Sequence, residues 1–300
     1  MTNTTDAENR AGIINAISAY FMWGFAPIYF KLIEFVSPSE ILIHRILWST
    51  LLLVVVIIIT QKWQRFTAIV KQPKLLLKLT ISASFLAVNW FLFIWAINNN
   101  HLLDASLGYF INPLFNVALG MIFLGERLRK WQKFAVVLAV IGVLIQLVIM
   151  GSLPMISLAL AGTFGIYGLL RKKMHLDSFI GLLIESLMML PIALGFWLFF
   201  VSSDTSNMFN NSWGLNMTLM MAGIVTTAPL LCFTAAAKRL TLSSLGFFQY
   251  IGPSIMFFLA TLFYHETLQP SKMVTFTFIW LALIIYSIDS LKARKASLVQ

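Results

Sequence analysis

The residues with the chemistry to carry a function are a few ionisable side chains set inside apolar stretches. His44 and Arg45 stand near the start of the apolar stretch 41–60, and Glu185 stands inside the stretch 180–201. Charged groups are costly in hydrocarbon, so ionisable residues there are candidates for function by default. Imidazole and carboxyl groups also exchange protons when their surroundings tune them toward neutral pH. We therefore take His44, Arg45 and Glu185 as candidates for a gate or for proton coupling.

A purely structural interpretation of the same residues stays open. The neighbouring charges allow two sets of ion pairs: Arg45 with Glu34 or Glu40, and Glu185 with Arg171 or Lys172. A long basic side chain near a helix end also extends toward the membrane surface without any further role. The sequence alone does not decide between ion pairing and proton exchange.

Three prolines interrupt apolar stretches that are otherwise suited to helices, and they are Pro27, Pro113 and Pro253. A proline inside a helix removes one hydrogen bond and leaves the carbonyl four residues earlier without a donor. In hydrocarbon that carbonyl must be satisfied by protein or by water in a cavity. We therefore expect a helix break or hinge at each of these prolines.

Polar and aromatic residues near the middle of the apolar stretches predict a cavity between helices. The candidate lining residues are Trp23, Asn89, Trp90, Tyr109, Asn112, Asn116, Gln249 and Tyr250. Aromatic walls with amide donors and acceptors suit a flat, amphipathic organic molecule better than an ion. The alternatives are that amide and small residues join neighbouring helices, and that tryptophans anchor at the membrane surface.

Several classes of chemistry have no support in this chain. It contains no GxxxxGK[ST], HExxH or GxSxG motif, and its single cysteine, Cys232, lies in an apolar stretch. The four histidines, at positions 44, 101, 175 and 265, do not cluster in sequence. No segment combines a basic face with interleaved aromatics, as nucleic-acid binding requires. We expect no enzyme activity, catalytic residue, cofactor, metal site or nucleic-acid partner.

The composition indicates that lipid is the solvent for most of the chain. Hydrophobic residues make up 59% of it and charged residues only 11%. A transmembrane helix needs about 20 apolar residues. The stretches that qualify are 13–33, 41–60, 75–97, 103–124, 131–149, 154–170, 180–201, 215–236, 242–263 and 271–291. The sequence therefore predicts an all-α integral membrane protein with ten transmembrane helices.

The basic residues predict the orientation of these helices. Of the 21 Lys and Arg residues, all but Lys31, Arg45 and Lys272 fall on one side of the predicted membrane. Lys and Arg accumulate in cytoplasmic loops. Both termini are therefore expected in the cytoplasm, and the chain in the inner membrane.

The two halves of the chain repeat one another. A shift of 140 residues places Pro113 on Pro253 and Glu126 on Glu266. Each repeat then holds five helices, so the second enters the membrane inverted, as in many secondary transporters. The predicted organisation is a cytoplasmic tail at 1–12, a first repeat at 13–149, an inverted second repeat at 154–291 and a basic cytoplasmic tail at 292–300.

The chain resembles RarD-type permeases, in the EamA branch of the drug/metabolite transporter superfamily. The stretches that carry the resemblance are AYFMWGFAPIYFKLI, EILIHRILWS, NWFLFIWAINNNHLLDASLGYFINPLFNVALGMIFLGER, GIVTTAPLLCFTAAAKRL and SSLGFFQYIGP. The resemblance implies two inverted EamA repeats around a central cavity, and a family label that refers to chloramphenicol.

We therefore expect a secondary transporter that exports a small amphipathic solute by alternating access. Its partners would be that small-molecule substrate and the membrane lipid, with proton coupling as one hypothesis. A channel or a structural membrane protein is the main alternative, and an intramembrane enzyme is a further one. The sequence leaves the substrate, the coupling ion and the oligomeric state open.

Overall fold

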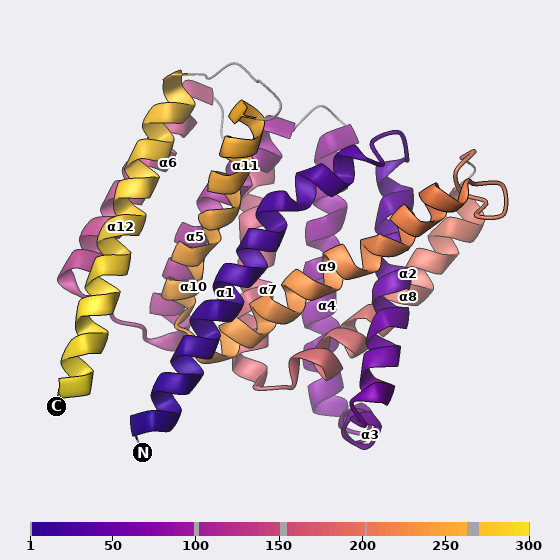
Figure 1. Cartoon of the computed structure of the whole chain (residues 1–300), viewed down its shortest axis with the longest axis horizontal. Helices are drawn as coiled ribbons and strands as arrows, with labels where there is room; N and C mark the ends of the chain where they lie inside the picture. Colours follow the sequence, from indigo (N-terminus) through magenta and orange to yellow (C-terminus); the bar gives the residue numbers. More distant parts are fainter. Residues whose placement is uncertain (1, 99–101, 151–154, 202, 263–269, 300) are drawn as a thin grey trace.

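The structure is a bundle of α-helices, seen here in a computed structural model (Figure 1). It describes residues 2–98, 102–150, 155–201, 203–262 and 270–299. The helices are α1 Thr2–Lys31, α2 Pro38–Ile59, α3 Trp63–Val70, α4 Pro73–Asn98, α5 Leu102–Leu124, α6 Lys130–Met150, α7 Met155–Met174, α8 Ser178–Phe200, α9 Trp213–Arg239, α10 Leu242–Gln249, α11 Ile251–Leu262 and α12 Pro270–Val299. Glu266, His101 and His265 lie outside the described residues.

Most of these helices have the length and composition to cross a membrane. Within the described ranges, eight spans qualify: Ala7–Leu32, Pro38–Ile59, Pro73–Phe93, Lys130–Ile149, Ser178–Phe200, Trp213–Arg239, Leu242–Leu259 and Met273–Ala293. Large apolar side chains also cover the outside of the bundle, with Leu198 and Phe199 each 81% exposed at the end of α8. Exposing so much apolar surface to water is unfavourable, whereas the hydrocarbon of a lipid bilayer accommodates it. The prediction of an all-α integral membrane protein is confirmed.

The helices pack in a defined set of pairs. α5 packs against α7 and α10, α6 against α12, and α1 against α9 and α11. α2 packs against α8 and α9, and α4 against α7. Figure 1 shows α6 and α12 at one edge of the bundle, α2 and α8 toward the other, and α9 running obliquely across it. The start of α1 and the end of α12 lie at the same end of the bundle (Figure 1).

One short helix was not expected from the sequence. α3 lies between α2 and α4 and spans only Trp63–Val70. Its Phe66 and Ile69 pack against the main hydrophobic core, whereas Trp63 is half exposed. Lys62 and Lys71 flank it. A segment of this kind suits the membrane surface, where an amphipathic helix lies with one face in the lipid.

The three prolines differ in their effect on the helices. α1 and α5 continue through Pro27 and Pro113, so the expected breaks at these residues are absent. The stretch 242–263 does break, between α10 and α11 at Tyr250. Pro253 has no N–H for the carbonyl of Gln249, and the chain tightens there. α5 remains one helix through Pro113 and packs against α7 and α10.

Glu126 joins the end of α5 to the start of α10. Gly125 follows α5 with φ 64°, a backbone conformation that suits glycine, and the N–H of Glu126 then donates to the carbonyl of Gly120 at 3.0 Å. The Glu126 carboxylate accepts the backbone N–H groups of Leu242 at 2.6 Å and Ser243 at 2.9 Å. A carboxylate at this position satisfies the free donors of a helix N-terminus and its dipole.

Candidate functional site

A small pocket lies inside the bundle between α2, α4, α8 and α9. Its lining residues are Ile46, Ser49, Leu53, Leu86, Trp90, Leu182, Glu185, Ser186, Met189, Thr226, Thr227 and Leu230. The sequence predicted Trp90 and Glu185 at a site and missed the hydroxyl groups. The sequence spacing could have indicated these hydroxyl groups. Ser49 follows Arg45 by one helical turn, and Thr226 stands one turn before a proline at 229.

Arg45 lies beside this pocket and contacts two of its lining residues. Its Nε donates to Oγ1 of Thr226 at 2.9 Å, and its guanidinium lies 4.7 Å from the ring centre of Trp90. The expected alternative, an ion pair of Arg45 with Glu34 or Glu40, is wrong. Glu34 pairs with Lys31 at 3.3 Å on the exposed surface, and Glu40 binds elsewhere.

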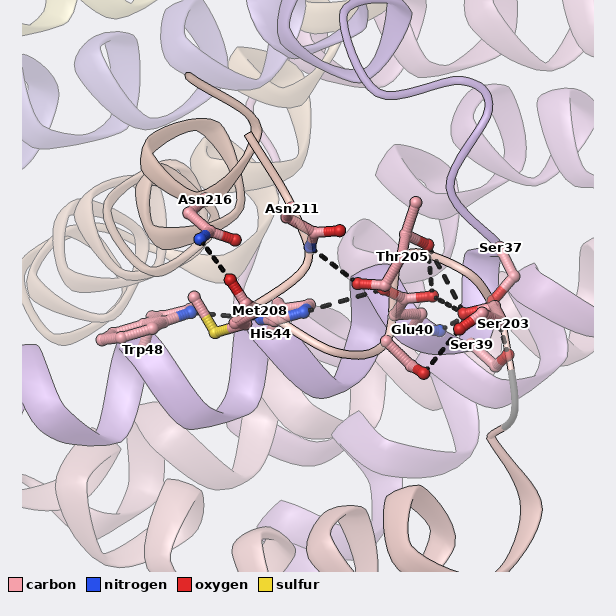
Figure 2. Close-up of polar contacts among 11 residues, drawn as sticks. Ser37, Ser39, Glu40, His44, Trp48, Ser203, Thr205, Met208, Asn211 and Asn216 are labelled. Atoms are coloured by element: carbon pink, nitrogen blue, oxygen red, sulfur yellow. Dashed lines mark hydrogen bonds and ion pairs between the residues drawn. The ribbon is translucent and has the colours of Figure 1, made fainter. Parts of the chain in front are cut away.

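Glu40 and His44 form a buried polar cluster at the start of α2, shown in Figure 2. The hydroxyl groups of Ser203 and Thr205 donate to Oε2 of Glu40 at 2.5 and 2.9 Å. Nδ1 of His44 accepts the indole N–H of Trp48 at 3.1 Å, so the neutral ring carries its proton on Nε2. That Nε2 faces Oε1 of Glu40 at 4.0 Å. The cluster joins α2 to the loop between α8 and α9.

The same loop is fixed by two amide side chains (Figure 2). Nδ2 of Asn211 donates to the carbonyl of Thr205 at 2.8 Å, and Nδ2 of Asn216 donates to the carbonyl of Met208 at 2.7 Å. These bonds hold the loop against Glu40 and close this end of α2. His44 therefore lies in a sealed position, while Arg45 contacts α4 and α9 beside the pocket.

Glu185 is buried in an ion pair and also lines the pocket. Its Oε1 lies 3.6 Å from Nη1 of Arg171, and the hydroxyl of Tyr167 donates to its Oε2 at 3.4 Å. The proposed pairing with Arg171 is confirmed, and the one with Lys172 is not, since Lys172 donates to the carbonyl of Ala237 at 3.2 Å. Removing either partner of a buried pair would strand the other charge.

The amide side chains of α5 and α10 bind each other and are not among the residues that line the pocket. Nδ2 of Asn116 donates to Oε1 of Gln249 at 3.0 Å, and both side chains are buried. Asn112 is also buried, and the hydroxyl of Tyr250 donates to the carbonyl of Phe110 at 3.2 Å. The hydrogen bond between Asn116 and Gln249 joins α5 to α10. Such a polar contact between helices is the alternative to a cavity that the sequence left open.

Trp23 and Asn89 also contact neighbouring helices. The ring of Trp23 packs at 5.9 Å from the rings of Phe164 and Phe233. Nδ2 of Asn89 donates to the carbonyl of Leu160 and to Oγ1 of Thr163, both at 2.9 Å.

Tyr109 is the candidate on α5 with the most accessible side chain. It is 39% exposed, and its ring meets that of Phe93 edge to face at 6.2 Å. Of the eight predicted lining residues, Trp90 lines the pocket.

Comparison with known proteins agrees with this helical architecture. Residues 10–148 match the model of the EamA-like transporter family. The chain is 55% identical to an uncharacterised transporter of Vibrio cholerae over 99% of both chains. The chain is a RarD-type member of the EamA-like transporter family. It is 52% identical to protein RarD of Escherichia coli K12 over 96% of this chain and 97% of that one.

Two further comparisons are more distant. A relative in Pseudomonas aeruginosa named chloramphenicol-sensitive protein RarD is 30% identical over 93% of this chain and 94% of its own length. A solved crystal structure superimposes with a TM-score of 0.73 over 95% of this chain and 99% of that chain, at 14% identity. That structure supports the fold alone. The family consists of transporters, so this chain is a multi-pass membrane transporter and not an enzyme.

Proposed function

We propose that this transporter is a secondary carrier that moves a small amphipathic organic solute across the bacterial inner membrane by alternating access. The observation that carries the proposal is the pocket among α2, α4, α8 and α9, which draws residues from both halves of the chain. It combines the apolar wall of Trp90 with hydroxyl groups and a carboxylate. Such mixed pockets suit small organic molecules. Export is the direction that the family resemblance suggests.

The pairs of packed helices support ten crossings in two inverted repeats, at 13–149 and 154–291. In the proposed repeats each helix of the first half has a counterpart in the second: α1 corresponds to α7, α2 to α8, α4 to α9, α5 to α10–α11, and α6 to α12. The contacts can be tested by exchanging each helix with its counterpart. The contact of α1 with α9 then becomes that of α7 with α4, and the contact of α5 with α7 becomes that of α11 with α1. The contacts α2–α8, α5–α10 and α6–α12 map onto themselves. This pattern is what a two-fold axis between the halves produces.

Ion pairs near the two chain ends support placing this end of the bundle in the cytoplasm. Arg239 binds Glu8 near the start of α1 at 2.6 Å, and Arg129 binds Asp289 near the end of α12 at 2.6 Å. Arg239 and Arg129 therefore lie at the same end of the bundle as the proposed cytoplasmic tail at 1–12 and the proposed basic cytoplasmic tail at 292–300. Basic residues concentrated at one end of a bundle favour the cytoplasmic side.

Counterflow in proteoliposomes tests the proposal. Because one relative is named for chloramphenicol, labelled chloramphenicol belongs in the first panel, beside aromatic acids and amides. A carrier shows saturation and stimulation by solute on the opposite side. Uptake without either would favour a channel, a chemically changed product would favour an enzyme, and no movement of any solute would favour a structural role. Each of these three results contradicts the proposal.

A further inference from the structure

Arg45 is an interior cation that has no carboxylate partner among the described residues. The two nearest acids in sequence are engaged, Glu34 by Lys31 and Glu40 by hydroxyl groups of the α8–α9 loop. Within the described part of the chain, Arg45 makes one side-chain hydrogen bond, from Nε to Thr226. A charge that is withdrawn from water and left without a counter-ion is costly, and in a transporter it marks a functional position.

The surroundings of Arg45 fix the plane of its guanidinium. Trp90 of α4 lies 4.7 Å from it, and Phe30 of α1 lies 5.9 Å from it, both measured to the ring centres. Thr226 of α9 accepts the hydrogen bond from Nε. Stacking on an aromatic ring leaves the edge of a guanidinium open, and that edge binds a carboxylate through two parallel hydrogen bonds.

Arg45 and Arg171 differ in this respect. Arg171 is 2% exposed and lies 3.6 Å from the carboxylate of Glu185. Arg45 is only partly buried, and its bond to Thr226 does not involve its two Nη groups. Neither Nη atom is among the buried polar atoms without a hydrogen-bond partner in the described part of the chain. The Nη groups of Arg45 are therefore available to a ligand, whereas those of Arg171 are enclosed by protein.

The pocket lies beside Arg45, and in this conformation it is smaller than an organic molecule, so cargo binding requires the surrounding helices to move apart. Trp90 and Thr226 line it next to Arg45, and Glu185 lines it from α8. An anionic group is attracted to Arg45, whereas the charge of Glu185 is balanced by Arg171. The apolar part of the wall, which includes Leu86, suits a hydrocarbon or aromatic body.

We propose that the cargo of this transporter is an organic anion whose carboxylate is bound by the two Nη groups of Arg45 and whose body packs against Trp90. This inference rests on the proposed function and narrows its substrate to one class. The bound carboxylate would supply the counter-ion that Arg45 lacks among the described residues. Thr226 acts here as a positioning residue, because its hydroxyl orients the guanidinium through the bond to Nε.

Ligand-induced stabilisation of the purified, full-length chain in detergent tests the proposal. The probes are benzoate, 3-phenylpropionate and indole-3-acetate, each compared with its own carboxamide at the same concentration. We expect at least one acid to raise the melting temperature more than its amide. Arg45→Gln should abolish that difference, and Arg45→Lys should weaken apparent binding of the acid by about tenfold, because lysine lacks the two-point geometry. Arg65→Gln, on the surface helix α3, is the matched control and should bind as the parent does.

Two results would overturn the inference. One is that no acid stabilises the parent beyond its amide, and the other is that Arg45→Gln binds the acid as the parent does. If Arg45→Gln does not fold, Arg45→Lys and Thr226→Val decide, since both keep the shape of the site. Parental affinity in both variants would overturn the inference.

Counterflow with the same probes separates this inference from the proposed function. An acid that binds through Arg45 but shows neither saturation nor stimulation from the opposite side refutes the carrier and leaves the anion site standing. Carrier kinetics for neutral amides that Arg45→Gln leaves unchanged refute the anion site and leave the carrier standing.

Discussion

At the scale of single residues, Asp177 has two roles at the start of α8. Its Oδ1 accepts the backbone N–H of Phe179 at 2.9 Å, which caps the helix, and its Oδ2 lies 2.7 Å from Nζ of Lys62. Partial burial acts to raise the pKa of Asp177, but the Lys62 ammonium and the backbone N–H groups outweigh it and hold that pKa below its usual value. The carboxylate therefore stabilises the fold in its ionised form.

We expect Asp177→Ala to lower the free energy of unfolding by about 1–2 kcal/mol at neutral pH, from the lost cap and the half-exposed ion pair. A group whose folded pKa is depressed contributes fully above its unfolded pKa of about 4 and loses that contribution as the pH falls further. Asp177→Asn keeps the cap and removes the charge, so its deficit should shrink toward about pH 3.5. Denaturant titrations at both pH values measure this; a deficit that stays constant would contradict the assigned charge effect.

His44 and Glu185 are the residues at which proton coupling is tested. Both are fully buried, His44 beside Glu40, and Glu185 beside Arg171 and Tyr167. We expect the double variant His44→Gln, Glu185→Gln to lose the dependence of transport rate on pH, because neither position then carries a group that can exchange a proton. Initial rates in proteoliposomes at fixed membrane potential give the readout.

The control for this experiment is His175, which is exposed after α7. It has φ 48°, and asparagine tolerates that conformation, so His175→Asn should keep both the fold and the parental pH profile. A full pH dependence in the double variant would exclude both buried residues as coupling sites.

At the scale of elements, α10 approaches α5 closely at Gly246. A Cβ on this residue would lie 2.6 Å from the carbonyl oxygen of Pro113, which is backbone and cannot turn away. Gly246→Ala should therefore push α10 from α5, stretch the bond between Asn116 and Gln249, and cost about 1–3 kcal/mol. Thermal unfolding of the purified protein measures the loss.

Gly195 on α8 provides the opposite case. A Cβ there meets nothing within 4 Å, so Gly195→Ala should be neutral or stabilise the helix by about 0.5–1 kcal/mol. If both alanine variants had the same stability, the close contact at Gly246 would not limit the packing of α5 against α10.

The sequence predicted the helices better than it predicted their contacts. Each of the ten apolar stretches lies largely within one long helix or, for 242–263, within α10 and α11. α3 was missed because its eight residues are too short for a spanning pattern. The breaks expected at Pro27 and Pro113 are absent, since both prolines lie inside continuous helices that pack against their neighbours. Proline chemistry is local, whereas this packing is tertiary and invisible in one sequence.

The candidate site shows the same division. Trp90 and Glu185 were found because aromatic and ionisable residues stand out in apolar stretches. Asn116 and Gln249 stood out equally, yet they bind each other across α5 and α10. The sequence showed that Arg45 is ionisable. It did not show that Arg45 has no carboxylate partner among the described residues, because this depends on Glu40 binding the α8–α9 loop instead. Residue type identifies polar groups in a membrane, and only packing shows which of them remain open to a ligand.

At the scale of the whole molecule, the one-sided distribution of the basic residues predicts how the bundle is oriented in the membrane. We expect one end of the bundle to face the cytoplasm, with the start of α1, the end of α12, the helix α3 and Arg239. The loop between α8 and α9 should face outward. Phe209 in that loop is 98% exposed, and Arg65 lies on the exposed part of α3. The single native thiol, Cys232, is half-buried in α9. Replacing it gives a background without a native thiol in which each end of the bundle can be labelled separately.

In a Cys232→Ala background, a membrane-impermeant maleimide should label Phe209→Cys in intact cells and label Arg65→Cys only after the membrane is opened. Ile192→Cys, on the 74% exposed lipid-facing side of α8, should stay unlabelled in both conditions, because a thiol in hydrocarbon does not form the reactive thiolate. The reverse pattern would place the basic end of the bundle outside. It would then contradict the orientation on which the proposed direction of export depends, while the contacts between the two halves would stand.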